Sequence, residues 1–187
     1  MKKLCRYCKT KFAPVRPMQA VCGPFCAIQI TAKKNAQVKK AAVALDKKET
    51  KQKLIKLKTR SQWVKEAQAA FNAWVRKRDM VAGFACISSG RVLDWTGNQT
   101  DAGHYRSTGA AKHLRFNPDN CHAQSKHDNR YLAGNAVDYR INLIKRIGLE
   151  RVEALEADQS IKKYTIDDLK GIILEYRTKV KHIESEK

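Results

Sequence analysis

The sequence is short of acidic side chains, since its 187 residues include 18 Asp and Glu against 38 Lys and Arg, a formal net charge of +20. It lacks any run of about 18 apolar residues, which excludes a membrane-spanning helix. Its first residues lack the apolar core of a secretory signal, so we expect a cytoplasmic protein with no membrane partner. Thiols stay reduced in that compartment, where clustered cysteines usually hold metal.

The shortage of acids is greatest at the N-terminal end. Residues 1–60 hold 17 Lys or Arg and 2 acids. Each Lys or Arg that meets a phosphate releases a condensed counterion, so this composition predicts a nucleic acid as partner. An arm that serves only solubility, or the tail of an RNA-binding or ribosome-associated protein, would have a similar composition. The candidate phosphate contacts on this arm are Lys33, Lys34, Lys39 and Lys40.

Four of the six cysteines lie near the N-terminus, as Cys5-x2-Cys8 and Cys22-x3-Cys26. Four thiolates at this spacing can converge tetrahedrally on zinc and leave no open position for water. The pattern predicts a structural zinc knuckle over residues 1–30, with disulfides as the alternative. Because so small a module buries little apolar surface, the metal would supply its folding free energy.

The segment from Ala27 to Lys58 contains no Gly or Pro and predicts one long helix. Its apolar residues are sparse, so residues 31–60 form a basic, largely solvated helical arm. This arm can lie along a DNA backbone, pair with a second subunit, or become ordered only on binding. Before it, we expect a short strand over 9–12 and a helix start at Cys26.

Another helix is predicted over residues 61–79, with Ser61 as its N-cap. Its apolar residues recur at three- and four-residue spacing, and its tryptophans are more often core than a platform for stacked bases. Short strands over 84–88 and 92–95 follow. In the last third we expect helices over 135–147 and 149–157, and a final helix that Thr165 starts with a capping box. The apolar stripe of that helix would pack on its own domain or on a second subunit.

The residues with the chemistry of a hydrolytic site begin on a strand predicted over 101–106, which carries His104. After a loop over 107–119, a helix is expected to open at Asn120 and to carry Asn129. A neutral imidazole with an ordinary pKa of about 6.5 can take a proton from water, so His104 is the candidate general base. A buried histidine satisfied by a backbone carbonyl is the alternative.

The asparagines have different predicted roles. Asn120 would hold the imidazole of His104 by hydrogen bonds, or would only cap a helix. Asn129 is a candidate ligand of Mg²⁺ or Mn²⁺ on the scissile phosphate, and Asp101 and His122 are further candidates. The candidate phosphate contacts in this region are Arg106, Lys112, Arg115 and Lys126.

These segments together resemble the NinG (Rap) recombination proteins of lambdoid phages, a family with HNH-type features. The resemblance covers most of the chain, and its most specific pieces are DAGHYR and GNAVDYRINLIKRIG. It implies a structure-selective, metal-dependent endonuclease that cuts branched DNA such as Holliday junctions and D-loops in the cytoplasm of the bacterial host. A two-fold symmetric junction would suit a homodimer.

One part of that pattern is missing. HNH members of this kind often carry a second zinc site of two C-x2-C pairs, which here fall on Cys86 with Ser89 and Ser125 with Asp128. Serine is a poor zinc ligand, so we expect packing and hydrogen bonds to hold the core instead. The alternative is an irregular site built from Cys86, Cys121, His127 and Asp128.

The sequence therefore predicts an α+β chain with a treble-clef-like zinc knuckle, a basic helical arm, an HNH-like ββα-metal core over residues 61–148 surrounded by helices, and a C-terminal helical segment over 149–187. The predicted function is that of a phage recombination endonuclease. The alternative is a non-catalytic, zinc-dependent nucleic-acid-binding protein with a decayed HNH core. Such a core should have lost His104, Asn120 and Asn129 as well, and these are present.

Overall fold

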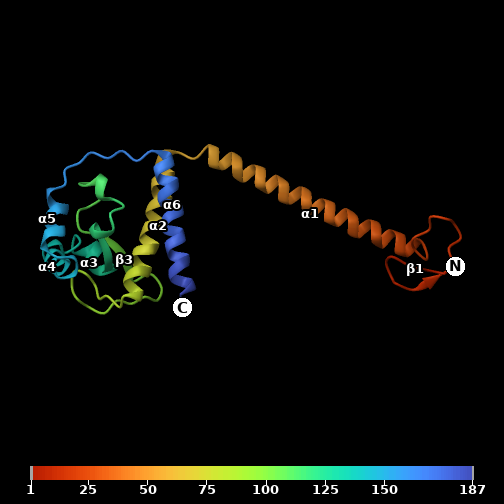
Figure 1. Cartoon of the computed structure of the whole chain (residues 1–187), viewed down its shortest axis with the longest axis horizontal. Helices are drawn as coiled ribbons and strands as arrows, with labels where there is room; N and C mark the ends of the chain where they lie inside the picture. The colour runs from red at the N-terminus through yellow and green to blue at the C-terminus, as the bar shows by residue number, and fades with distance from the viewer. Residues whose placement is uncertain (1, 187) are drawn as a thin grey trace. The chain divides into compact units, whose positions relative to one another are not determined.

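The computed structural model of the chain describes residues 2–186 and divides into two compact units, Met1–Lys58 and Thr59–Lys187. The chain is mostly helical and contains two small sheets, so it is of mixed α and β structure (Figure 1). Over the described residues, every helix is too short or too polar to cross a membrane.

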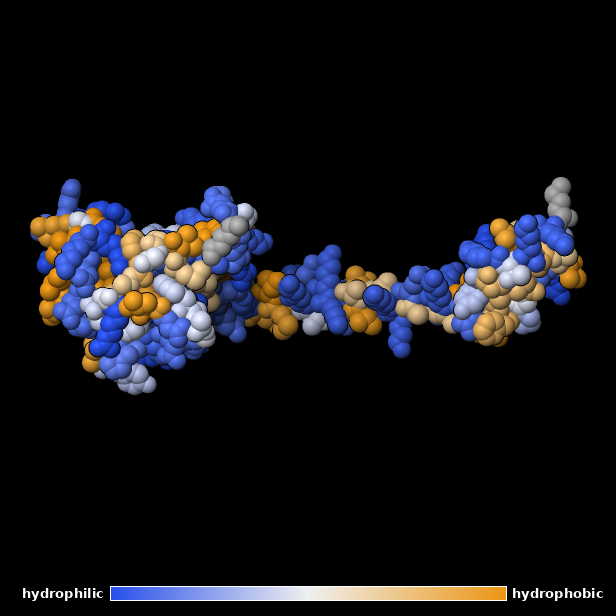
Figure 2. All heavy atoms as spheres, turned by 90° about the horizontal axis from the view of Figure 1, so that it is seen from below, coloured by the Kyte–Doolittle hydropathy of each residue, from blue (hydrophilic) through white to orange (hydrophobic). Residues whose placement is uncertain are grey.

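The first unit contains β1 (Lys3–Leu4), paired antiparallel with β2 (Lys11–Phe12), and the long helix α1 (Pro24–Lys56). The predicted short strand and long helix are confirmed within three residues. The helix starts at a proline, because the fixed φ of proline suits the first helical position. Only Cys26 of α1 is buried, and Figure 2 shows hydrophilic and apolar side chains mixed along the helix.

The second unit is organised around α2 (Arg60–Val81) and α6 (Ile166–Ser185), which lie side by side. The predicted N-cap of the first helix is wrong by two residues. Thr59 caps it, in a capping box with Gln62, because Ser61 already lies inside the first turn. The predicted capping box at Thr165 is confirmed.

The aromatic side chains between these helices form the main core, as the periodicity predicts. Phe71 is fully buried, and its ring centroid lies 4.9 Å from Tyr176 and 5.9 Å from Phe116. Truncation of such a side chain to alanine typically costs about 3–5 kcal/mol of stability. The predicted apolar stripe therefore contributes to the core. Phe71 lies inside it, and the partly buried Trp63 and Trp74 pack against its edge.

The second sheet is a pair of antiparallel strands, β3 (Thr100–His104) and β4 (Cys121–Ser125), with Gly103 opposite His122. The strand predicted over 101–106 is thereby confirmed, although it ends two residues early. The two strands are separated by a long loop that contains two short 3-10 turns.

Helices cover both faces of this hairpin (Figure 1). Ala102 and Cys121 join the core formed with α2 and α6. On the other side lies α4 (Ala136–Ile147), whose Tyr139 donates a hydrogen bond to the Gly103 carbonyl at 3.0 Å. Because side chains alternate along a strand, neighbouring residues of β3 contact different helices.

The C-terminal helices agree with the predicted spacing. The helix predicted over 135–147 is α4, and the helix predicted over 149–157 is α5 (Leu149–Ala157). Gly148 separates them with a φ of 88°, a left-handed conformation that glycine adopts without strain. Together with Ile87, these helices enclose a second apolar cluster.

The strands predicted over 84–88 and 92–95 are wrong. This segment forms turns, in one of which the Cys86 N–H donates to the Arg91 carbonyl at 2.9 Å. The apolar pattern that suggested strands has another explanation, since Cys86 and Leu93 are buried in a small cluster against β4.

The helix predicted to open at Asn120 is also wrong. Pro118–Asn120 forms a single 3-10 turn, after which the chain enters β4. The next helix, α3 (Lys126–Tyr131), begins after Ser125, whose hydroxyl accepts a hydrogen bond from the Asp128 N–H at 3.1 Å. The order strand, strand, helix is therefore β3, β4, α3.

The end of α2 is fastened to the edge of β4 by ionic hydrogen bonds. Asp79 is fully buried, and its carboxylate accepts from the Ala123 N–H and from Arg78 Nε, both at 2.6 Å. Arg78 also donates to the Cys121 carbonyl at 2.9 Å and lies 3.1 Å from Nδ1 of His122. Loss of one partner from such a buried set leaves an uncompensated charge, which typically costs about 3–5 kcal/mol.

This cluster predicts a loss of stability in weak acid. Burial, followed by the charge of Arg78, lowers the pKa of His122 from 6.5 to about 4. The unfolded chain therefore takes up a proton near pH 6.5 that the folded chain refuses until about pH 4. Stability from the neutral imidazole is complete above pH 6.5 and falls by roughly 3 kcal/mol as the pH drops to about 4.

Urea unfolding followed by tryptophan fluorescence checks this, because all three tryptophans lie in the second unit. His122→Gln should flatten the dependence of the free energy of unfolding on pH between 6.5 and 4. His182→Gln is the matched control, since the side chain of His182 is 71% exposed. Equal pH dependence in the parent and in His122→Gln would contradict the assignment.

Candidate functional site

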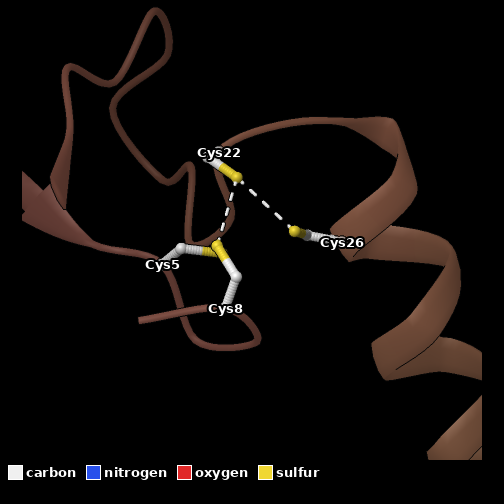
Figure 3. Close-up of side chains that lie close together, drawn as sticks. All are labelled: Cys5, Cys8, Cys22 and Cys26. Carbon is white, nitrogen blue, oxygen red and sulfur yellow. Dashed lines mark hydrogen bonds between the residues drawn. The ribbon is translucent and has the colours of Figure 1, made fainter. Parts of the chain in front are cut away.

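The four N-terminal cysteines come together as predicted. The Sγ atoms of Cys5, Cys8, Cys22 and Cys26 all lie within 4.8 Å of one another (Figure 3). Cys22 lies 3.6 Å from Cys8 and 3.4 Å from Cys26 between sulfur atoms. Zinc with four sulfur ligands at about 2.3 Å would separate the sulfurs by about 3.8 Å. The cluster could therefore hold a zinc ion with little movement of the side chains.

Local structure brings these thiols together. The first pair closes a turn in which the Cys5 carbonyl accepts from the Lys9 N–H at 3.0 Å, and Lys9 has a φ of 61°. Cys26 lies in the first turn of α1. Burial raises the pKa of the Cys5 thiol, but hydrogen bonds from backbone N–H groups of the loop outweigh it and lower the pKa to about 6. This favours the thiolate of Cys5 that a metal needs, whereas the hydrogen bond with Cys22, followed by burial, raises the pKa of Cys26 to about 12.

The four positions of the missing second knuckle also meet, and Cys86 is the one cysteine among them. Cys86 Sγ donates to Asp128 Oδ2 at 3.1 Å, and the Ser89 hydroxyl donates to the same oxygen at 2.5 Å. The Ser125 N–H donates to Cys86 Sγ at 3.2 Å. Burial raises the pKa of Asp128, but the hydrogen bonds from Ser89, Cys86 and Ser125 outweigh it and lower the pKa to about 2. A hydrogen-bonded carboxylate therefore stands where a metal would join the two pairs.

The irregular zinc site considered as an alternative does not form. Cys121 Sγ lies 3.7 Å from Nδ1 of His104, in a different cluster from Cys86 and Asp128. Across residues 2–186, the N-terminal cysteines are the only group of three or more His, Cys, Asp or Glu side chains close enough to share an ion.

His104 is the last residue of β3 and is partly exposed. Its Nε2 lies 2.9 Å from the Arg115 carbonyl oxygen, which has no hydrogen, so Nε2 is the donor. In the neutral ring, Nδ1 then carries the lone pair. Burial lowers the pKa of His104 below its ordinary value. The imidazole is therefore neutral at pH 7 and has one nitrogen able to accept a proton.

Asn120 is fully buried and holds the loop rather than the imidazole. Its Oδ1 accepts from the Arg106 N–H at 2.8 Å, and its Nδ2 donates to the carbonyls of Arg106 and Leu114 at 3.0 and 3.2 Å. The predicted hydrogen bond to His104 is not among these contacts. Asn120 instead braces the segment that presents the Arg115 carbonyl to His104.

Two predicted cation ligands, Asp101 and Asn129, are in contact. Asn129 Nδ2 donates to Asp101 Oδ2 at 3.1 Å, and Arg130 Nε donates to the same oxygen at 3.1 Å. The amide oxygen of Asn129 and the second carboxylate oxygen are the atom types that Mg²⁺ prefers. Sequence reasoning missed Arg130, although its place directly after Asn129 was a signal that it would lie nearby.

The structure does not bring His104 to this pair. Asp101 and His104 are three residues apart on one strand, so they project to opposite faces of the hairpin. The imidazole lies on the α2 side, with its centroid 6.2 Å from Phe71. Over the described residues, no hydrogen bond joins it to Asp101 or Asn129.

His122 lies apart from the other predicted ligands. Its Nε2 donates to the Asp119 carbonyl at 3.2 Å, and its Nδ1 faces Arg78 near Asp79. Both ring nitrogens are thus engaged within the protein. The signal that sequence reasoning missed is Asp79, a lone carboxylate at the end of an otherwise apolar helical stripe.

The predicted phosphate contacts fall in different settings. Arg106 donates to the carbonyls of Leu155 and Asp158 at 2.7 and 2.6 Å, so it holds the end of α5 and the residue that follows it. Arg115 and Lys126 are half-buried and Lys112 is exposed. The four lysines of the arm, Lys33, Lys34, Lys39 and Lys40, are exposed on α1.

Comparison with known proteins gives consistent matches. The family model described as Bacteriophage Lambda NinG protein matches residues 1–186. Protein ninG of Escherichia phage lambda is 39% identical over 191 residues, which cover 95% of this chain and 90% of that protein. The proteins ninG of Salmonella phage P22 and Escherichia phage 933W are 38% and 36% identical, over 94% and 98% of this chain and 90% and 94% of their own lengths. No solved structure matches. Because the family match spans nearly every residue, the chain belongs to the NinG family of bacteriophage proteins.

Proposed function

We propose that this chain is a divalent-metal-dependent endonuclease that cuts branched DNA, such as Holliday junctions and D-loops, in phage recombination. The observation that carries the proposal is the hydrogen bonding and protonation of the His104 imidazole. Its Nε2–H is committed to the Arg115 carbonyl, so Nδ1 is the accepting nitrogen, with the Cys121 thiol 3.7 Å from it, and burial favours the neutral ring. This is the form that a general base must have before it takes a proton from water.

The chemistry assigned to His104 is a single proton transfer. As the oxygen of a water molecule bonds to phosphorus, its proton passes to Nδ1, and the bond from phosphorus to the leaving sugar oxygen breaks. Asp101 and Asn129 would hold Mg²⁺ or Mn²⁺, which supplies positive charge to the phosphate when bound. The order β3, β4, α3 is that of a ββα-metal unit and supports this reading, although the imidazole and the oxygen pair project to opposite faces of the hairpin.

The N-terminal unit would bind the DNA and hold a structural zinc ion. Its basic lysines are exposed on a solvated helix, so they are available to phosphates. The cysteine cluster has four thiols for one metal and leaves no position for a reacting water. The unit would therefore contribute affinity, and the second unit would contribute chemistry.

A second candidate function is favoured by one observation. Asp101 already has Asn129 and Arg130 as partners, and it projects to the opposite face from His104. A non-catalytic, zinc-dependent nucleic-acid-binding protein needs no convergence of base and ion. Such a protein would bind junctions and would leave them uncut.

The general base is tested by His104→Ala. A positioned base contributes about 10² to 10⁴ in rate, so ion-dependent cleavage should fall by that factor. Junction affinity should stay within about threefold, because Lys and Arg supply it. Cleavage of a labelled junction and gel-shift affinity measure the two effects. His182→Ala, on the exposed surface of α6, is the control, and undiminished cutting by His104→Ala would rule out this role.

The cation ligand is tested by Asn129→Ala. Loss of one oxygen ligand weakens ion binding and spares the base, so raising Mg²⁺ or Mn²⁺ should restore part of the cleavage rate. The measurement is the rate across an ion titration in parent and variant. His104→Ala should show no such rescue. If the two variants respond alike to added ion, Asn129 is not a ligand.

The zinc content is tested by metal analysis of the purified chain. We expect about one zinc per chain, because one four-thiolate cluster is present. Cys22→Ala should lose that zinc and unfold the first unit, while tryptophan fluorescence of the second unit is retained. Two tightly held zincs would contradict the metal-free network around Asp128, and none would contradict the knuckle.

A further inference from the structure

The second unit contains a basic pocket that none of the proposed catalytic residues line. Its volume is about 830 Å³, and it lies between the start of α2, the loop around residues 109–115 and the segment 159–164. Five cationic side chains and no acid line it. The cations are Arg60, Lys112, Arg115, Lys162 and Lys163.

Arg115 is the best-placed cation of this pocket. It is half-buried, and its guanidinium donates to Gln68 Oε1 at 3.1 Å and to the Thr108 carbonyl at 3.3 Å, both neutral groups. Within the described part of the chain, no carboxylate lies within 4.0 Å of it. Removing a guanidinium from bulk water without a counterion costs free energy, and a bound anion that accepts its remaining hydrogen bonds would offset that cost.

Two acids, Asp158 and Asp168, flank the lining segment 159–164 in the sequence, and both accept hydrogen bonds. Asp158 lies 3.6 Å from Nε2 of His113 and accepts from the Ser160 N–H at 2.8 Å. Asp168 accepts from the Thr165 N–H at 2.8 Å in the capping box of α6. Asp168 also interacts electrostatically with Lys162, but the lining itself contains no acid, so its five cations keep a net positive charge.

The pocket offers no surface on which a base could stack. It has two aromatic rings: the side chain of His113 is 9% exposed, and Tyr164 is 8% exposed, with its hydroxyl donating to the His113 carbonyl at 2.8 Å. One side of the Tyr164 ring lies 5.0 Å from Lys162 Nζ, and Phe116 packs edge-on against it. Recognition in this pocket would therefore concern phosphates and not base identity.

We propose that this pocket binds phosphate groups of the DNA backbone, as a second DNA-binding site separate from the basic arm. Its volume lies in the range of ligand pockets and exceeds what one phosphate needs. The choice of DNA as the source of the phosphates rests on the proposed function. Arg115 links the pocket to that function, since it lines the pocket and its carbonyl accepts the hydrogen bond of His104.

The salt dependence of junction binding by the full chain, in EDTA, tests the site. Lys162→Gln/Lys163→Gln removes two exposed cations from the pocket. The slope of log affinity against log salt should become shallower by about 2, since each phosphate contact contributes about 0.9. Lys145→Gln/Lys181→Gln removes two exposed lysines elsewhere in the same unit and should leave the slope unchanged. An unchanged slope in the pocket variant, or an equal change in both, overturns the proposal.

Arg115→Gln provides a second variant, with a larger expected loss because Arg115 is the half-buried anchor. Cleavage of the same junction with Mn²⁺ separates this proposal from the proposed function. If the pocket variants weaken binding but the parent chain does not cleave the junction, the nuclease proposal is contradicted and the pocket proposal is supported. Ion-dependent cleavage, together with salt slopes that are the same in the parent and the pocket variants, would contradict the pocket proposal and support the nuclease proposal.

Discussion

The carboxylate of Asp79, fully buried at the end of α2, meets the unpaired edge of β4 through the Ala123 N–H and meets the guanidinium of Arg78 on the same side. A charge in that position is tolerable only because its partners are already in place. The bond fixes β4 against α2, and β4 in turn fixes β3 by five backbone pairs. The position of His104 between Phe71 and the Arg115 carbonyl follows from that sheet.

A second carboxylate, that of Asp128, joins the segment before the hairpin to the end of β4. Asp128 gathers hydrogen bonds from Cys86 and Ser89 in the segment before the hairpin, and Ser125 joins from the end of β4. The carboxylate is stable there because those donors favour its ionised form, which keeps its pKa near 2. Asn129 is the next residue, so the network also sets where the amide faces Asp101. Hydrogen bonds from a thiol and a hydroxyl to one carboxylate thus hold the two turns together.

The features predicted best from the sequence are those that depend on the local spacing of residues. The long helices, the capping box at Thr165 and the convergence of four cysteines each depend on residues within a few turns of one another. The turns between residues 84 and 95 could not be predicted from local spacing, because their apolar residues pack on a strand about 30 residues away. The role of Asn120 was beyond it for the same reason, since its partner Arg106 lies fourteen residues earlier. The three-residue spacing of Asp101 and His104 on the predicted strand, by contrast, already implied that they project to opposite faces.

The account assigns binding to exposed cations and chemistry to one neutral histidine, and these can be separated in a single assay. The parent chain is incubated with a labelled four-way junction and, in parallel, a matching linear duplex, with Mg²⁺ or Mn²⁺ and with EDTA. The account predicts cleavage of the junction that needs the ion, stops in EDTA, and is much weaker on the duplex. Tight binding of the junction without cleavage in either ion would contradict it and would make the chain a DNA-binding protein without catalytic activity.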